Sequence, residues 1–153
     1  MRGLLIYGNM EEKYMKLALK EAKKAYLLNE VPIGAVIVYK NKIVGRGYNQ
    51  KEKTQNALKH AEMIAIKKAC SKLKSWRLDD CVMYVTLEPC AMCKGAIAEA
   101  RIKKVIYAIK SKYSEHLFEK TDISEYSNIN TECLKILQDF FAKKREKSKD
   151  VML

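Results

Sequence analysis

The fold is decided by residues 81–100, which read CVMYVTLEPCAMCKGAIAEA. Cys81–Leu87 is nearly all apolar, which is typical of a central strand covered on both faces. Cys90–Ala100 has the spacing of a helix, and Lys104–Ile109 follows as another buried strand. The stretch therefore predicts two strands of one sheet joined by a crossover helix.

Upstream, the pattern predicts a helix followed by a hairpin. Apolar residues between Met10 and Leu28 recur at helical spacing among many charges, so this helix has one buried face. The nine residues before Met10 lack that pattern, and we expect them to be a loose extension or to precede the true start at Met10. Ile33–Tyr39 and Ile43–Asn49 are rich in β-branched residues and are joined by a short turn.

Two further helices complete the prediction, at His60–Lys74 and Glu132–Lys147. No clear period runs through Lys110–Thr131, so that segment receives no assignment. The order of strands and helices predicts a three-layer α/β/α fold with a mixed central sheet. The length, 153 residues, predicts a single domain over residues 1–153.

Composition narrows the class of protein. The chain has 48% apolar residues, 6 Gly and 2 Pro, which excludes a disordered or collagen-like chain. No apolar run reaches the roughly 18 residues of a membrane span, so we expect a cytoplasmic protein with no membrane partner. A formal net charge of +12 favours polyanionic partners such as nucleic acid, although a lysine-rich surface also serves solubility alone.

The chemistry is concentrated in His60-Ala61-Glu62 and in Pro89-Cys90-Ala91-Met92-Cys93. One imidazole and two thiolates form a three-ligand zinc set, which a catalytic site uses when it leaves the fourth position to water. Cys90 and Cys93 lie three residues apart in the first turn of a predicted helix, so both sulfurs project from one face. Random placement would give Pro-Cys-x-x-Cys only about 0.002 times per chain.

Glu62 lies two residues beyond the candidate ligand His60, where its carboxylate can move protons without binding the metal. This pattern predicts a hydrolytic reaction. The remaining cysteines, Cys70, Cys81 and Cys133, lie apart within apolar patterns, and we interpret them as core thiols.

The pattern H-x-E followed by P-C-x-x-C is the signature of zinc nucleobase deaminases. The chain resembles the bacterial tRNA-specific adenosine deaminase family, within the cytidine deaminase superfamily, over about residues 10–109 and again from about residue 132. The resemblance is carried by the following stretches: Glu30–Val36, Asn49, His60–Met63, Ser75–Leu78, Tyr84–Cys93, Glu132-Cys133 and Asp139–Phe141.

This resemblance implies a homodimeric enzyme with the cytidine deaminase fold that converts the wobble adenosine of a tRNA anticodon to inosine. It implies that His60, Cys90 and Cys93 hold one zinc ion per subunit. Glu62 would shuttle protons while a zinc-activated water attacks C6 of adenine and ammonia leaves.

The resemblance also implies a substrate pocket. Asn49 would hydrogen-bond the flipped base, and Ala61 and Leu87 would lie along the pocket. From the residues alone, Asn49 reads equally well as a turn residue at a strand end.

One segment departs from the family pattern, because Lys110–Thr131 contains no glycine and is about ten residues shorter than its counterparts. Tyr113, His116 and Phe118 could stack on RNA bases there, or pack an irregular loop. The departure keeps open a deaminase of a free base or nucleoside, of guanine or cytosine type. A third alternative is a non-catalytic RNA-binding or zinc-stabilised structural protein, against which the acidic Glu62 argues.

The C-terminal helix ends in a basic run. Its members are Lys143, Lys144, Arg145, Lys147 and Lys149. Such a run provides the charge of a phosphate contact surface, although a chain end of this kind is often only solvated.

Overall fold

The computed structural model describes residues 2–112 and 121–151, with side chains over residues 10–112 and 121–149. The helices and strands along the chain are α1 (Arg2–Leu27), β1 (Gly34–Tyr39), β2 (Lys42–Tyr48), α2 (Lys51–Thr54), α3 (Ala61–Leu73), β3 (Cys81–Leu87), α4 (Ala91–Glu99), β4 (Lys104–Ile109), β5 (Asp122–Glu125) and α5 (Asn130–Val151).

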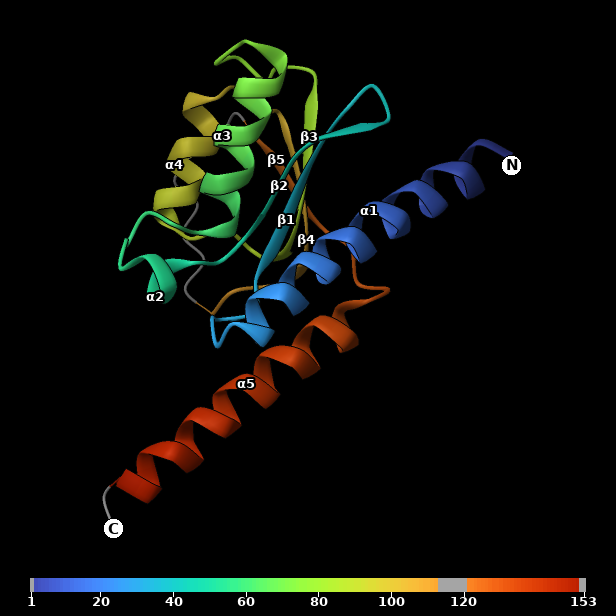
Figure 1. The fold of residues 1–153 in the computed structure, drawn as a ribbon. Coiled ribbons are helices and arrows are strands. Elements are labelled where there is room, and N and C mark those ends of the chain that lie inside the picture. Colours follow the sequence, from blue (N-terminus) through green and yellow to red (C-terminus); the bar gives the residue numbers. More distant parts are fainter. Residues whose placement is uncertain (1, 113–120, 152–153) are drawn as a thin grey trace.

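The five strands form one mixed sheet in the order β2-β1-β3-β4-β5. β1 pairs antiparallel with both β2 and β3, whereas β3, β4 and β5 run parallel. Helices α3 and α4 cover one face of the sheet, and α1 and α5 lie on the other (Figure 1). The predicted α/β/α architecture with a mixed sheet is therefore confirmed.

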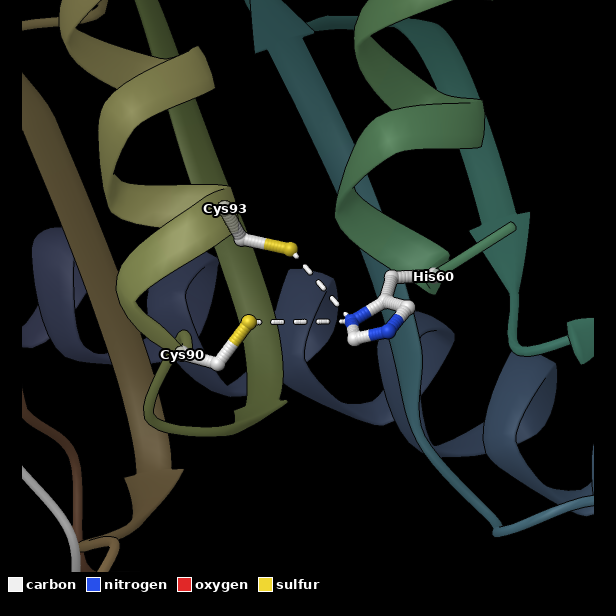
Figure 2. A group of neighbouring side chains, drawn as sticks. All are labelled: His60, Cys90 and Cys93. Carbon is white, nitrogen blue, oxygen red and sulfur yellow. Dashed lines mark hydrogen bonds between the residues drawn. The ribbon is translucent and has the colours of Figure 1, made fainter. Parts of the chain in front are cut away.

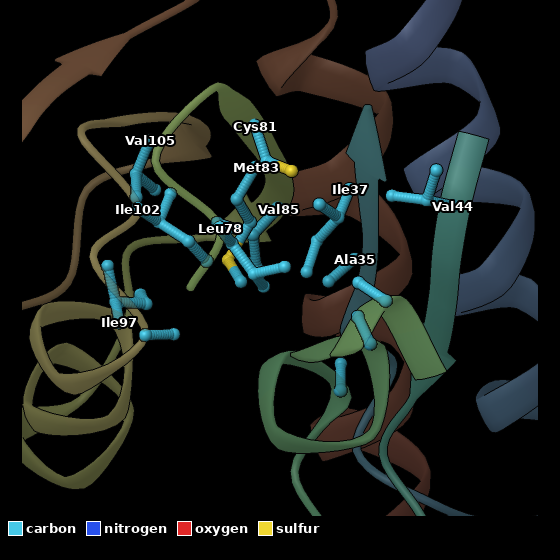
Figure 3. Packing of buried hydrophobic residues seen from close by; sticks show 14 of the residues in the cluster. Ala35, Ile37, Val44, Leu78, Cys81, Met83, Val85, Ile97, Ile102 and Val105 are labelled. Carbon is cyan, nitrogen blue, oxygen red and sulfur yellow. The ribbon is translucent and has the colours of Figure 1, made fainter. Parts of the chain in front are cut away.

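The alternation of side chains along each strand explains the two layers of core. In β1, Ala35 and Ile37 face α3 and α4, whereas Val36 and Val38 face α1. Figure 3 shows the first of these clusters, in which residues of β1 and β3 pack beside Leu78, Ile97 and Ile102. Because both faces of β3 are buried, its sequence carries almost no polar residue.

Close packing of α3 on β2 requires glycine. A Cβ added to Gly45 would lie 2.3 Å from the carbonyl oxygen of Ala65, and one added to Gly47 would lie 2.2 Å from that of Ala61. The buried side of α3 carries alanines, which also allow the helix to approach the sheet. This contact sets the distance between the sheet and the first turn of α3, where His60 and Glu62 are found.

The first helix is longer than predicted. The helical pattern predicted a start at Met10, whereas α1 begins at Arg2. The prediction relied on an apolar stripe, but once a helix has formed, each added residue gains one backbone hydrogen bond, and the end of a helix needs no buried face.

Two short elements were not predicted, α2 and β5. β5 lies in the unassigned segment and pairs with β4 through its backbone, while most of its side chains are exposed. Tyr113, His116 and Phe118 lie outside the described residues. Among the described residues, no helix combines the length and the apolar composition that a bilayer crossing requires.

Candidate active site

The first turns of α3 and α4 bring the predicted zinc ligands together. His60 is the N-cap residue of α3, and Cys90 is the N-cap residue of α4. Neither side chain caps its own helix, although the N-cap position normally supplies such a bond. Both side chains instead point toward each other across the gap between the helices (Figure 2).

The distances fit a tetrahedral metal ion. His60 Nδ1 lies 3.7 Å from Cys90 Sγ and 3.6 Å from Cys93 Sγ. All three donor atoms lie within 4.8 Å of one another. A zinc ion bound at about 2.0 Å from nitrogen and about 2.3 Å from sulfur in tetrahedral geometry separates these donors by about 3.5 Å. The donor set therefore matches zinc in both chemistry and spacing.

The thiols and the imidazole perturb one another. Hydrogen bonds from the Cys93 thiol and from His60 lower the pKa of Cys90 to about 3. The bond to Cys90, followed by burial, raises the pKa of Cys93. The hydrogen bond to Cys90 likewise raises the pKa of His60. The lowered pKa of Cys90 favours its thiolate form, which is the form that binds metals.

Glu62 lies in the first turn of α3 and is only 4% exposed. Burial raises the pKa of its carboxyl, although the neighbouring Cys93 and His60 act in the opposite direction. A carboxyl in such surroundings can hold a proton closer to neutral pH than an exposed glutamate can. Its interactions with Cys93 and His60 place the Glu62 carboxyl beside the predicted metal ligands.

Asn49 is buried at the end of β2, and its side chain makes two hydrogen bonds to the backbone. Its Nδ2 donates to the carbonyl oxygen of Val31 at 3.4 Å, and its Oδ1 accepts from the Lys51 backbone N–H at 3.3 Å. The second bond spans two residues and corresponds to the turn function that the sequence left open. Both bonds are long, so the amide is weakly held.

The other two predicted pocket residues differ in surroundings. The Ala61 side chain is 1% exposed and belongs to the core between α3 and the sheet. Leu87 is half-buried at the last position of β3, opposite Ile109 of β4. Only Leu87 therefore has side-chain surface free for a ligand.

Two buried carboxylates hold the loops beside the site, and the sequence did not assign them a role. Glu30 is fully buried and accepts from the backbone N–H groups of Glu52 and Lys53, at 3.2 and 2.8 Å. Glu88 accepts from Lys94 Nζ at 3.1 Å and from the Ser111 backbone N–H at 3.2 Å. In the sequence, both residues lie within stretches that carry the family resemblance, and each is an acidic residue near an apolar strand.

The remaining cysteines belong to the core. Cys81 and Cys133 are buried in the two hydrophobic clusters, and Cys70 is partly buried against the first. Burial raises the pKa of Cys81 to about 11 and that of Cys133 to about 12. These thiols are protonated at neutral pH, in agreement with the structural role predicted for them.

Comparisons with known proteins agree with this geometry. The model of the MafB19-like deaminase family matches residues 9–145. The tRNA-specific adenosine deaminase of Bacillus subtilis is 40% identical over 150 residues, which cover 91% of this chain and 93% of that protein.

Two solved structures are also similar. A structure from a study of A-to-I editing by tRNA:A34 deaminases is 33% identical, has a TM-score of 0.76, and covers 82% of this chain and 99% of that chain. The guanine deaminase of Bacillus subtilis is 40% identical with a TM-score of 0.62, over 65% of this chain and 64% of that chain. The chain belongs to the MafB19-like deaminase family and to the tRNA-specific adenosine deaminases.

Proposed function

We propose that this protein hydrolyses the wobble adenosine of a tRNA anticodon to inosine, releasing ammonia. The observation that carries the proposal is the 40% identity to a tRNA-specific adenosine deaminase over nearly the whole of both chains. The cluster of His60, Cys90 and Cys93 beside Glu62 supports it, because these are the residue types that hydrolytic deamination of a base requires.

The metal that we propose is zinc, one ion per subunit, held by His60 Nδ1 and by the sulfurs of Cys90 and Cys93. When bound, zinc would supply a Lewis acid that lowers the pKa of a water molecule toward neutrality. The protein residues supply the rest of the chemistry. The two helix N-termini favour the thiolate ligands, and burial of Cys93 restricts access of bulk water.

Glu62 would act as the proton carrier. Its carboxylate would take a proton from the attacking water and deliver it to the base, so that the exocyclic amine leaves C6 as ammonia. Adenosine and water are thereby converted to inosine and ammonia with no other reactant. The raised pKa of the Glu62 carboxyl suits a group that must hold the proton between these two transfers.

Asn49, Ala61 and Leu87 would form the base pocket. The Asn49 amide has a donor and an acceptor, and its two long bonds to the backbone could be exchanged for bonds to the base. Leu87 would contact the flat face of the base, and Ala61 would contribute through the backbone that carries Glu62. An Asn49→Ala variant should raise KM more than it lowers kcat.

We propose tRNA as the partner, and the basic end of α5 as one of its contacts. Lys143 is paired with Asp139 at 3.3 Å, whereas the exposed Lys144, Arg145, Lys147 and Lys149 make no ion pair with any described side chain. Replacing these four with glutamine should weaken RNA binding and flatten its salt dependence. An unchanged salt slope would exclude the tail as a contact surface.

We also propose a cytoplasmic location, because the relatives are named for action on tRNA, and a homodimer, as the family resemblance implies. Light scattering on the metal-loaded protein would test the oligomeric state, with twice the 17.6 kDa chain mass as the expected result.

The decisive experiment compares substrates side by side. An anticodon stem-loop with adenosine at the wobble position is assayed beside free adenine, guanine, cytosine and their nucleosides. Inosine in the RNA alone supports the proposal. The 40% identity to a guanine deaminase favours guanine as the second candidate, and turnover of a free base alone would keep the chemistry and reject the tRNA substrate.

A further inference from the structure

We infer that the outer surface of α3 binds the phosphate backbone of the RNA substrate, at a place separate from the basic end of α5. The surface is a groove lined by Lys59, Lys67, Lys68 and Lys72, together with Gln50, Ile64 and Ser71, and we call it the α3 groove. The inference rests on the proposed function, because it assigns a contact to the same substrate.

The α3 groove begins beside the site. Gln50 directly follows Asn49, and Lys59 directly precedes His60. The Gln50 backbone N–H donates to the carbonyl oxygen of Lys59 at 2.9 Å, which ties the two chain segments together. The lining of the α3 groove therefore adjoins Asn49 and His60, two residues of the candidate site.

The shape of the α3 groove suits an extended chain. It has a volume of about 640 Å³ and is lined mostly by exposed residues of α3. From Ile64 to Lys72 the helix rises about 12 Å. Phosphates follow one another every 3.4 Å along a stacked strand, so this length offers room for about three of them.

Charge identifies the ligand class. Four ammonium groups line the α3 groove and no carboxylate does. Among the ion pairs of the described side chains, none involves these four lysines. Lys72 Nζ approaches only a backbone carbonyl, that of Ile43, at 3.5 Å. The ammonium groups are therefore available for an anion, and their number exceeds the charge of a single phosphate.

A second copy of this chain fits the α3 groove less well than RNA does. A symmetric contact through this surface would place lysines of one copy opposite the same lysines of the other, and facing like charges disfavour such an interface. An RNA backbone carries a negative charge at every nucleotide, opposite in sign to the lysines. We therefore assign the surface to RNA and leave the dimer contact to other parts of the chain.

The test is a triple variant, Lys67→Gln with Lys68→Gln and Lys72→Gln, prepared as the metal-loaded full chain. Its matched control is Lys13→Gln with Lys20→Gln and Lys23→Gln, which removes the same charge from exposed positions on α1, across the sheet. Binding of the wobble-adenosine stem-loop is measured at several salt concentrations. Inosine formation at saturating RNA is measured in parallel.

We expect the α3 variant to lower the slope of log K against log salt by about 2, which is three contacts at about 0.7 each for a single strand. Its Kd near physiological salt should rise on the order of tenfold, with kcat within twofold of the unaltered protein. The α1 control should change neither quantity by as much. Equal effects from both variants would show that RNA binding depends only on the net charge of the protein, and would overturn the inference.

Lysine acetylation gives an independent readout that needs no variant. RNA should protect Lys67, Lys68 and Lys72 from acetylation while Lys13, Lys20 and Lys23 react as before. If RNA binds and is deaminated but these α3 lysines stay reactive, the α3 groove is not the contact, although the proposed function survives. If the unaltered protein neither binds nor deaminates the stem-loop, the proposed function itself has failed. A change of oligomeric state in the α3 variant would assign the surface to a second copy instead.

Discussion

Lys94 Nζ lies 3.1 Å from a carboxylate oxygen of Glu88, and both side chains are almost completely buried. Glu88 precedes the Pro89-Cys90 pair, and Lys94 directly follows Cys93. The ion pair therefore closes the short segment that carries both thiols. The same carboxylate accepts from the Ser111 backbone, so the segment is also tied to the chain beyond β4.

Breaking this pair should destabilise the protein. Lys94→Met leaves the Glu88 carboxylate in a buried site without this ammonium group, at an expected cost of about 3–5 kcal/mol. Metal affinity should fall as well, because the ion pair no longer holds the segment that carries Cys90 and Cys93. Urea unfolding and metal titration would measure both quantities. Lys104→Met, at an exposed position on β4, is the control and should cost less than about 0.5 kcal/mol.

Removing the Glu62 carboxylate should abolish turnover while the fold and the metal remain. In Glu62→Gln the volume is kept but the proton carrier is lost, so kcat should fall by on the order of 10²–10⁴. Metal content by mass spectrometry should stay at one ion per chain. Glu99→Gln, on the exposed side of α4, should retain full activity. Full activity of Glu62→Gln would assign the proton transfer to another group.

Cysteine reactivity should report the metal site. The pKa of Cys90 is lowered to about 3, mainly by its hydrogen bond from Cys93, so after metal removal its thiolate fraction is constant between pH 5 and 8. Alkylation of Cys90 by iodoacetamide should therefore proceed at a rate that does not depend on pH over this range. An ordinary thiol with a pKa near 8.5 would react about tenfold faster for each pH unit.

Cys81 and Cys133 serve as internal controls, because their raised pKa values, about 11 and about 12, and their burial keep both unreactive in the folded protein. Added zinc should protect Cys90. A Cys90 that alkylates equally fast with and without zinc would contradict its assignment as a ligand.

Gly47→Ala should test the close contact between β2 and α3. The new methyl group would lie 2.2 Å from the Ala61 carbonyl oxygen, so the helix must move away from the sheet. We expect a loss of about 1–3 kcal/mol in the free energy of unfolding, and reduced kcat because His60 and Glu62 move with the helix. Arg46→Ala, at the exposed neighbouring position, should leave both quantities nearly unchanged. Chemical unfolding and the deamination assay would measure the two effects.

The Glu30 carboxylate should matter through the loop that it holds. Glu30→Gln replaces one acceptor oxygen with an amide NH₂, so one of the two backbone N–H groups of α2 loses its partner, at about 1–3 kcal/mol. The loop between Asn49 and His60 should loosen, raising KM for RNA. Glu52→Gln is the exposed control. If KM and stability are both unchanged in Glu30→Gln, Glu30 does not position this loop.

The sequence predicted those elements whose pattern is local. Cys81–Leu87 and Lys104–Ile109 match β3 and β4 residue for residue, because apolar runs bounded by charged residues mark fully buried strands. β5 was missed because its residues, Asp122–Glu125, carry no strand signal and its pairing depends on the backbone of β4. The start of α1 was missed because a helix end can extend without a buried face.

The residues of the candidate site also divide into those that a local sequence pattern reveals and those that it does not. His60, Cys90 and Cys93 were identified from their residue types together with their spacing, since His-x-Glu and Pro-Cys-x-x-Cys each stand at the start of a helix. The parts played by Glu30 and Glu88 could not be found in this way. Both carboxylates act on backbone groups more than 20 residues away, and such contacts leave no trace in local sequence.

The convergence of two helix starts on one point also bears on how the chain folds. His60 and Cys90 are 30 residues apart, and the chain between them includes all of α3 and β3. An ion held by both would close this loop much as a disulfide does, and removing the loop's freedom from the unfolded chain is worth about 3.6 kcal/mol in the chain-entropy model. Because β3 lies within this loop and pairs with β1 and β4, an ion held at both ends of the loop would stabilise the sheet as well as the site.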